Sequence, residues 1–273
     1  MSKGITSTEG LVRKVFAIPH DDELTTFYRG HSNRDKYKLE PSLYRNRGHK
    51  ESEHILFREL LIANPTDFSS DYSTFEKLVR MQHYSMPTRL LDITSNPLMA
   101  LYFTCKSNPD KTGEVVVMKV RRNEIKFFDS DTASCIANLA RLPQQDKESI
   151  DFNLADAPFN ESLPVTRLLH FVREERPYFL SKIVPADLKR ILCVKGRMTN
   201  NRISSQSGAF LLFGLDATLP EAGNAEIAVD RITIKASEKA KILRELDSLN
   251  INESTVFPYI ENSAKHIAKR HEV

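Results

Sequence analysis

The chain has 273 residues, of which 40% are hydrophobic and 27% are charged. This composition is typical of a globular protein, and the length is enough to bury a core in one large domain or two small ones. Its 39 basic and 36 acidic side chains nearly cancel, and the two signs are interleaved along the chain. A protein that binds nucleic acid through its phosphates usually has a clustered basic excess, so the charge does not indicate a nucleic-acid partner, although it does not forbid one.

The sequence also limits the compartment. No apolar run approaches the roughly 18 to 20 residues that a membrane span needs, and the first residues, MSKGITSTEG, lack the apolar stretch of a signal peptide. Cys105, Cys135 and Cys193 lie far apart in apolar surroundings, which fits buried thiols in a reducing compartment. Because there is neither a C-x-x-C nor an H-E-x-x-H motif, we expect no metal site. We therefore expect a soluble, cytoplasmic protein without a membrane partner.

The apolar patterns predict helices and strands in an irregular order. The predicted strands are 24–29, ending at Gly30, then 114–120, 190–194, 209–213 and 226–234. The predicted helices are 51–63, 74–82, one that begins at 97, mainly helical structure over 132–173, and one that ends at 249. Helices and strands do not alternate as they do in a doubly wound sheet. We therefore predict the α+β class, with a mixed, largely antiparallel sheet core and surrounding helices.

Three helix starts carry capping signals. Ser73 and Glu76 are spaced as in a capping box, in which each side chain binds a free backbone amide of the first turn. Asn96 precedes a proline, which predicts an asparagine N-cap and proline at the first helical position. Ser237 is the predicted cap of the last helix. For the domain organisation, we expect residues 1–23 to form an N-terminal helical extension and residues 24–273 a single domain.

The segment from Met81 to Phe103 is the most informative in the chain. Two prolines and several small polar residues interrupt what would otherwise be helix, yet apolar helices flank the segment. A helix end, a short strand and a helix start must therefore meet within it. Such an arrangement brings polar side chains and free helix-terminal amides together, and these amides favour an anionic ligand. We predict that this segment forms one wall of a polar pocket.

Each polar residue of the segment also has a purely structural interpretation. Arg89 and Asp92, three residues apart, are either an ion pair or part of the pocket. His83 either stabilises the helix end by capping or stacking, or lines the pocket. Thr94 and Ser95 either help to cap the next helix or belong to the pocket. The density of hydrogen-bonding side chains in an apolar setting favours the pocket, since buried polar groups need partners.

Several motifs follow one another along the chain. The longer ones are Phe27-Tyr28-Arg29-Gly30, Leu39-Glu40-Pro41-Ser42-Leu43-Tyr44-Arg45, Gln82-His83-Tyr84-Ser85-Met86-Pro87-Thr88-Arg89-Leu90-Leu91-Asp92, Asn96-Pro97 and Ala100-Leu101-Tyr102-Phe103. Two weaker ones are Arg202-x-x-x-Gln206-x-Gly208-x-Phe210 and Val256-Phe257-Pro258. In this order they resemble the FRG domain family, over about residues 24 to 270. Ser85 departs from the family, which usually has glycine there. If the position needs a positive φ, the serine is strained.

A more distant likeness, in the order of elements, is to ADP-ribosyltransferases that use NAD. Those enzymes have an aromatic-Arg-Gly strand, a Ser/Thr-rich strand entering a helix, and a late strand with a catalytic glutamate. The resemblance implies NAD as cofactor and an ADP-ribosyltransferase-like fold. It implies catalytic positions at Arg29, Asp92 and Gln206, and ligand-binding positions at Tyr28, Gly30, His83, Arg89, Thr94, Ser95 and Arg202.

The chemistry of these residues supports binding more strongly than turnover. Arg29, at a strand end, could bind a diphosphate or ribose through its forked guanidinium. Cleavage of a nicotinamide–ribose bond builds positive charge on the sugar, which a carboxylate would stabilise. Gln206 is neutral and cannot supply that charge. Asp92 could, unless Arg89 neutralises it. Gln206-x-Gly208 is also compatible with a strand that bulges at the glycine.

Three functions therefore remain open. The first is an NAD-using transferase or hydrolase, in a bacterial toxin or phage-defence setting, with a macromolecular target that the sequence does not identify. The second is a non-catalytic module that senses a nucleotide-like small molecule. The third is a nuclease in which Asp92 and His83 act as metal ligand or general base. It ranks last because no second carboxylate is well placed near Asp92.

Overall fold

The computed structural model describes residues 4–197 and 208–257. Its described strands form one seven-stranded sheet in the order β4-β5-β6-β2-β1-β3-β7. Neighbouring strands are antiparallel except β4 and β5, which are parallel. The bounds are β1 Leu24–His31, β2 Leu90–Thr94, β3 Gly113–Arg121, β4 Lys126–Phe127, β5 Ile191–Lys195, β6 Gly208–Phe213 and β7 Ile227–Ile234. The predicted α+β class and the largely antiparallel sheet are confirmed.

Helices occupy most of the remaining described chain. The α-helices are α1 Thr8–Phe16, α2 Arg47–Glu51, α3 Glu53–Ala63, α4 Thr74–His83, α5 Pro97–Lys106, α6 Asp131–Asn138, α7 Gln144–Glu148, α8 Asp156–Glu161, α9 Leu163–Glu175, α11 Lys239–Ser248 and α12 Glu253–Val256. Short 3-10 helices are η1 Ser42–Arg45, η2 Arg122–Glu124, η3 Leu139–Arg141, η4 Pro185–Lys189 and η5 Ala236–Glu238. None of the helices among these residues is long and apolar enough to cross a membrane.

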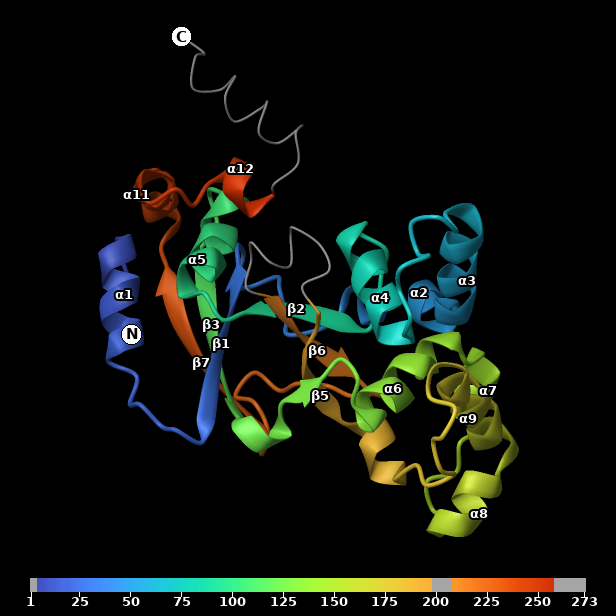
Figure 1. The fold of residues 1–273 in the computed structure, drawn as a ribbon. Helices are drawn as coiled ribbons and strands as arrows, with labels where there is room; N and C mark the ends of the chain where they lie inside the picture. Colours follow the sequence, from blue (N-terminus) through green and yellow to red (C-terminus); the bar gives the residue numbers. More distant parts are fainter. Residues whose placement is uncertain (1–3, 198–207, 258–273) are drawn as a thin grey trace.

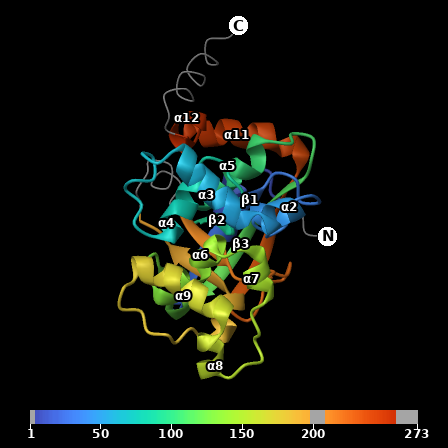
Figure 2. The same cartoon turned by 90° about the vertical axis from the view of Figure 1, so that its right-hand side faces the viewer.

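Two groups of helices cover the same face of the sheet, one over each half. Helices α1, α5 and α11 pack on β1 and β3 through a core that includes Tyr28 and Val117. Helices α4, α6 and α9 pack on β2 and β6 through a core that includes Leu90 and Leu212. The alternate strand residues, Leu91 among them, form one cluster on the opposite face. Figure 1 shows α5 and α4 on either side of β2, and Figure 2 gives the view turned by 90°.

Two of the three predicted helix caps are confirmed. The Ser73 hydroxyl accepts from the amide of Glu76, and the Glu76 carboxylate accepts from the amide of Ser73 at 3.1 Å. The Asn96 side chain accepts from the amide of Leu98 at 3.0 Å, with proline at the first helical position. The prediction for Ser237 was wrong. Residues Ala236–Glu238 form a 3-10 turn, and α11 begins only at Lys239.

Strand β1 runs through Gly30, where the sequence predicted its end, and stops at His31. The glycine has a packing role instead. A Cβ atom at position 30 would lie 2.1 Å from the backbone oxygen of Ala100 and 2.7 Å from the backbone nitrogen of Thr104. Helix α5 therefore lies directly on the backbone of β1, and only glycine allows this close approach.

The N-terminal segment shares its core with the rest of the fold. Leu11 of α1 is fully buried in the cluster that contains residues of α5 and α11. Ile5 forms a parallel bridge with Ile234 at the end of β7. The helix predicted for the extension 1–23 is thus present, and it packs against the elements that follow.

Candidate functional site

A cavity of about 250 Å³ lies where the two helix groups part, over the junction of β1, β2 and β6. Strand residues form its floor, α4 forms one side and α5 the other. It is lined by Tyr28, Arg29, Gly30, Val79, Gln82, His83, Asp92, Ile93, Thr94, Met99, Ala100, Phe103, Gly208, Ala209 and Phe210. Six of the residues named from the sequence are among them: Tyr28, Arg29, Gly30, His83, Asp92 and Thr94. The predicted wall, Met81 to Phe103, supplies more than half of the lining.

The cavity lies where the sheet is nearly divided. Strand β1 pairs with β3 along its whole length, from Leu24 to His31. Strand β2 likewise pairs with β6 along its whole length. The registered contact between β1 and β2 is the single pair Tyr28 and Thr94. Beyond this pair the two strands diverge, and the polar groups of their edges are left for side chains or a ligand.

Arg29 occupies this division. Its Nη1 atom donates to the backbone oxygen of Asp92 at 2.6 Å, which replaces a ladder hydrogen bond between the diverging strands. Its Nε atom is buried and has no hydrogen-bond partner among the described residues. Burial lowers the pKa of Arg29, the Asp92 carboxylate opposes that shift, and Arg45 adds to it. No carboxylate in the described part of the chain is within ion-pair distance of this guanidinium.

Asp92 accepts a hydrogen bond from an amide rather than from a cation. Gln82 Nε2, at the end of α4, donates to Asp92 Oδ2 at 2.9 Å. The predicted alternative of an ion pair with Arg89 does not form. Arg89 and Asp92 lie on opposite faces because side chains along a strand alternate with a period of two. The carboxylate of Asp92 therefore lines the cavity, and no cation among the described residues forms an ion pair with it.

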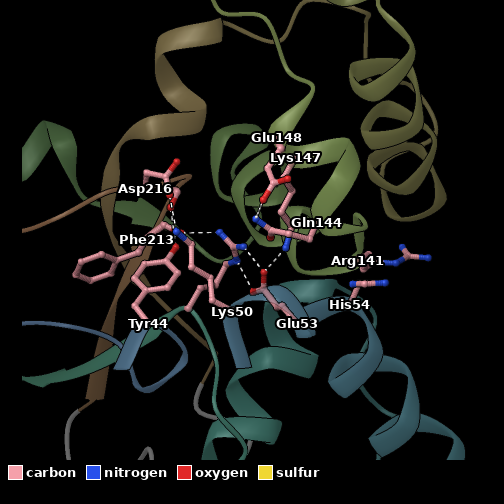
Figure 3. A network of polar contacts seen from close by, with 12 residues as sticks. Tyr44, Lys50, Glu53, His54, Arg141, Gln144, Lys147, Glu148, Phe213 and Asp216 are labelled. Atoms are coloured by element: carbon pink, nitrogen blue, oxygen red, sulfur yellow. Dashed lines mark hydrogen bonds and ion pairs between the residues drawn. The ribbon is translucent and has the colours of Figure 1, made fainter. Parts of the chain in front are cut away.

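Arg89 belongs to a separate, buried network. Its Nε donates to Glu53 Oε1 at 2.8 Å, and its Nη1 donates to the backbone oxygen of Phe213 at 2.8 Å. Lys147 donates to the same carboxylate at 2.6 Å, so Glu53 on α3 lies between α7 and the start of β2 (Figure 3). Burial alone would raise the pKa of Glu53, but Arg89 and Lys147 outweigh it and lower that pKa to about 2. Arg89 was predicted to bind ligand, and the structure places it away from the cavity.

The remaining predicted residues of the segment divide between the cavity and the helix caps. His83 lines the cavity and also stacks edge-on against Tyr84, with ring centres 4.9 Å apart. Thr94 is buried in the lining, and its hydroxyl accepts from the amide of Asn96 at 3.0 Å. Ser95 is exposed and is not among the lining residues.

Helix α5 contributes its flank rather than its first amides. Met99, Ala100 and Phe103 face the cavity. Pro97 has no amide hydrogen, and the amide of Leu98 is taken by Asn96. The amide of Leu98 is therefore not available to an anion, contrary to the part that the sequence predicted for helix-terminal amides.

Ser85 has a φ of 66°. It follows the last turn of α4, where its amide donates to the oxygen of Gln82 at 3.0 Å and the amide of Met86 donates to Met81 at 3.0 Å. This pair of bonds is the Schellman ending of a helix, which usually has glycine at the left-handed position. Ser85 therefore has the positive φ for which the sequence predicted strain.

Two predicted residues, Arg202 and Gln206, lie outside the described residues. Gly208 and Phe210 of the same motif line the cavity. Glycine 208 begins strand β6, which pairs regularly with β2. Within the described chain, no group of three or more His, Cys, Asp or Glu side chains could hold a metal ion.

The parts that Gln82 and Phe210 play in the lining were not predicted. Gln82 was visible in the long motif, and its position on the last turn of α4 gave the signal. Phe103 ends the predicted wall, and Phe210 was named only within the late motif, because an apolar pattern does not distinguish a cavity wall from a packed interior. Tyr28 lines the cavity and is also buried, and this burial raises the pKa of its hydroxyl.

Comparison with known families agrees with the motifs. The model of the FRG domain family matches residues 25–113, which include β1, α4, β2 and α5 and most of the cavity wall. The search of curated proteins found no match. The search of solved structures found none either, so an ADP-ribosyltransferase likeness has no support from it. The match and the motifs within it identify residues 25–113 as an FRG domain.

Proposed function

We propose that this FRG-domain protein binds an anionic, nucleotide-like small molecule in the cavity between α4 and α5. The observation that carries the proposal is the contrast between two arginines. Arg89 is buried with a carboxylate, Glu53, to match it. Arg29 lines the cavity, and no such partner exists for it in the described part of the chain. Since a partly buried charge without an ion-pair partner is costly, an anionic ligand beside Arg29 would reduce that cost.

The walls favour a ligand with a ring and hydroxyl groups. Tyr28, Phe103 and Phe210 offer aromatic surface. The Asp92 carboxylate can accept hydrogen bonds from the hydroxyls of a sugar. The cavity of about 250 Å³ is slightly smaller than the roughly 300 to 1,000 Å³ of typical ligand pockets. It therefore suits one nucleoside-sized part of a larger molecule such as ADP-ribose or NAD.

NAD cleavage or ADP-ribosyl transfer is the second candidate function, and one observation favours it. The Asp92 carboxylate accepts from the neutral Gln82 instead of from Arg89, and it forms no ion pair with a cation among the described residues. A carboxylate in that state can stabilise positive charge on a ribose as the nicotinamide bond breaks. Such chemistry would fit a bacterial toxin or phage-defence protein that acts in the cytoplasm.

Calorimetry on the whole chain tests the binding proposal. ADP-ribose, NAD and inorganic phosphate are titrated into the wild type, Arg29→Ala, Arg29→Lys and a control, Arg47→Ala. Arg47 is an exposed arginine whose partner is Glu51 on its own helix, so it matches Arg29 in chemistry but not in place. We expect ADP-ribose to bind the wild type and the control equally. Arg29→Ala should bind about 10- to 100-fold more weakly, because charge-assisted hydrogen bonds are lost.

The lysine variant separates charge from geometry. Arg29→Lys keeps the charge but not the planar fork, so intermediate affinity is expected. Binding of ADP-ribose that is equally tight in Arg29→Ala would remove Arg29 from the site. Absence of binding by all three probes in the wild type would overturn the proposed ligand class.

A further inference from the structure

A network of hydrogen bonds joins the end of α4 to strand β2 and includes the carboxylate of Asp92. Gln82 Nε2 donates to Asp92 Oδ2 at 2.9 Å and to the backbone oxygen of Leu90 at 3.2 Å. The hydroxyl of Thr88 donates to Gln82 Oε1. The same hydroxyl oxygen accepts from the amide of Leu90 at 3.2 Å. Each polar atom of the Gln82 amide group therefore has a partner.

This set of bonds fixes which way the Gln82 amide points. Both N–H groups are used, one on Leu90 and one on Asp92, and the oxygen takes the hydroxyl hydrogen of Thr88. In the flipped orientation the amide oxygen would face a carboxylate and a carbonyl oxygen, which are all acceptors. The two acceptors, on Leu90 and Asp92, thus select the orientation in which Gln82 donates to Asp92, and the Thr88 hydroxyl stabilises it by donating to the amide oxygen.

The backbone turn at Ser85 makes the contact possible. Residues 83–87 reverse the chain after α4, and the two helix-ending hydrogen bonds at Ser85 and Met86 hold that reversal. Gln82 on the last turn of the helix thereby lies beside strand β2, ten residues ahead of its partner Asp92 in sequence. Thr88 is fully buried between them.

We propose that Gln82 is a positioning residue for Asp92, and that Thr88 stabilises the orientation of the Gln82 amide. Gln82 holds Oδ2, so that Oδ1, which has no hydrogen-bond partner among the described residues, is the oxygen offered to the ligand. The proposal rests on the proposed function in one respect, namely that Asp92 contacts the ligand. It assigns to Gln82, which also lines the cavity, a role in affinity that is exerted through Asp92.

A double-mutant cycle on ADP-ribose affinity tests this assignment. The variants are Gln82→Met, Asp92→Ala and the double mutant, measured by calorimetry on the whole chain. We expect Gln82→Met to weaken binding about tenfold in the wild-type background, the effect of one lost hydrogen bond to a charged group. In the Asp92→Ala background it should have no further effect. An equal loss in both backgrounds means independent action and overturns the proposal.

Thr88 provides a rescue test. Thr88→Val removes the hydroxyl at nearly constant shape, so it should weaken ADP-ribose binding in the same direction as Gln82→Met. Thr88→Ser keeps the hydroxyl and should restore wild-type affinity. A purely structural role for this residue would make Thr88→Ser, which leaves a methyl-sized gap, lose affinity as Thr88→Val does.

Failure of the proposed function can be distinguished from failure of this inference. If the wild type binds neither ADP-ribose nor NAD, the proposed function is wrong. The same double-mutant cycle is then measured as free energies of unfolding in urea. There the losses in unfolding free energy from Gln82→Met and Asp92→Ala should be non-additive, since each removes the same hydrogen bond. Additive losses would show that Gln82 does not hold Asp92.

Discussion

Arg29 and Asp92 are joined by a hydrogen bond of 2.6 Å from the guanidinium Nη1 to the backbone oxygen, not by an ion pair between their charged groups. The cation and the carboxylate therefore line one cavity without a direct ion pair between them. The sheet is divided next to the pair Tyr28 and Thr94. This makes the arrangement possible, because β1 and β2 are no longer paired from Arg29 onward. A ligand with an anionic group and hydroxyl groups would match both residues at once.

Asp92→Asn tests turnover. The change keeps the shape and the acceptor for Gln82 but removes the negative charge that would stabilise a ribose cation. If the protein cleaves NAD, release of free nicotinamide by Asp92→Asn should fall by about 100-fold or more. Unchanged release in this variant would contradict the role of Asp92. Release by neither protein, with ADP-ribose still bound, would favour the non-catalytic sensing module.

Gly30→Ala tests the close approach of α5 to β1. The added Cβ would lie 2.1 Å from the backbone oxygen of Ala100, and neither backbone can move without disturbing the core. We expect a loss of about 3 kcal/mol or more in the free energy of unfolding, measured by urea denaturation. A loss below about 1 kcal/mol would mean that β1 and α5 are not in this contact.

Gly10→Ala is the matched control. Gly10 lies in α1, and a Cβ there would meet Ile5 at an ordinary contact distance of 3.4 Å. Because alanine favours helix over glycine, this variant should be more stable than the wild type by up to about 1 kcal/mol.

Ser85→Gly tests strain at the end of α4. A left-handed φ costs a residue with a Cβ atom about 1 kcal/mol, and Ser85 is held at 66° by two helix-ending hydrogen bonds. Glycine should raise the free energy of unfolding by about 0.5 to 1 kcal/mol. The control is Ser149→Gly at the end of α7, where φ is −86° and glycine should be destabilising. A loss of stability in Ser85→Gly would show that the serine side chain contributes more than its strain costs.

Acid should weaken the fold through Glu53. Its pKa is lowered from 4.5 to about 2 in the folded protein, so its stabilising contribution is complete above the unfolded pKa and is lost as the pH falls toward 2. The shift corresponds to about 3 kcal/mol. Glu53→Gln should therefore cost several kcal/mol at pH 7 and progressively less below about pH 4.5 in urea unfolding.

Glu51→Gln, an exposed carboxylate paired with Arg47, should leave that pH dependence unchanged. If Glu53→Gln does not fold, Glu53→Asp provides the comparison, because it keeps the charge at a longer distance from Arg89. A constant difference between wild type and Glu53→Gln from pH 7 to pH 3 would contradict the depressed pKa.

Local signals in the sequence predicted local structure well. The Ser73–Glu76 box and the Asn96-Pro97 start were right because capping depends on residues within one turn. The partner of Arg89 could not be predicted in the same way. Glu53 lies 36 residues away in sequence, and its contact with Arg89 follows from the tertiary fold, which brings the start of α3 beside the residue that precedes β2.

The candidate site shows the same limit. The motif indicated that Arg29, His83, Asp92 and Thr94 would share a pocket, and they line one cavity. The bond from Gln82 to Asp92 depends on how the chain reverses at Ser85, which residue types alone do not specify. The end predicted for β1 at Gly30 was wrong for a related reason. Glycine is needed there because α5 packs closely on the strand, and not because the chain turns.

Backbone amide chemical-shift mapping during titration with ADP-ribose tests the central claim most directly. The shifts should move at residues of the cavity floor, Gly30, Asp92 and Ala209 among them, and stay constant at Phe179 beside the separate hollow near α9. In Arg29→Ala the same changes should appear only at about tenfold or higher ligand concentration. Shift changes that gather away from the cavity, or that are the same in Arg29→Ala, would contradict a ligand site built around Arg29 and Asp92.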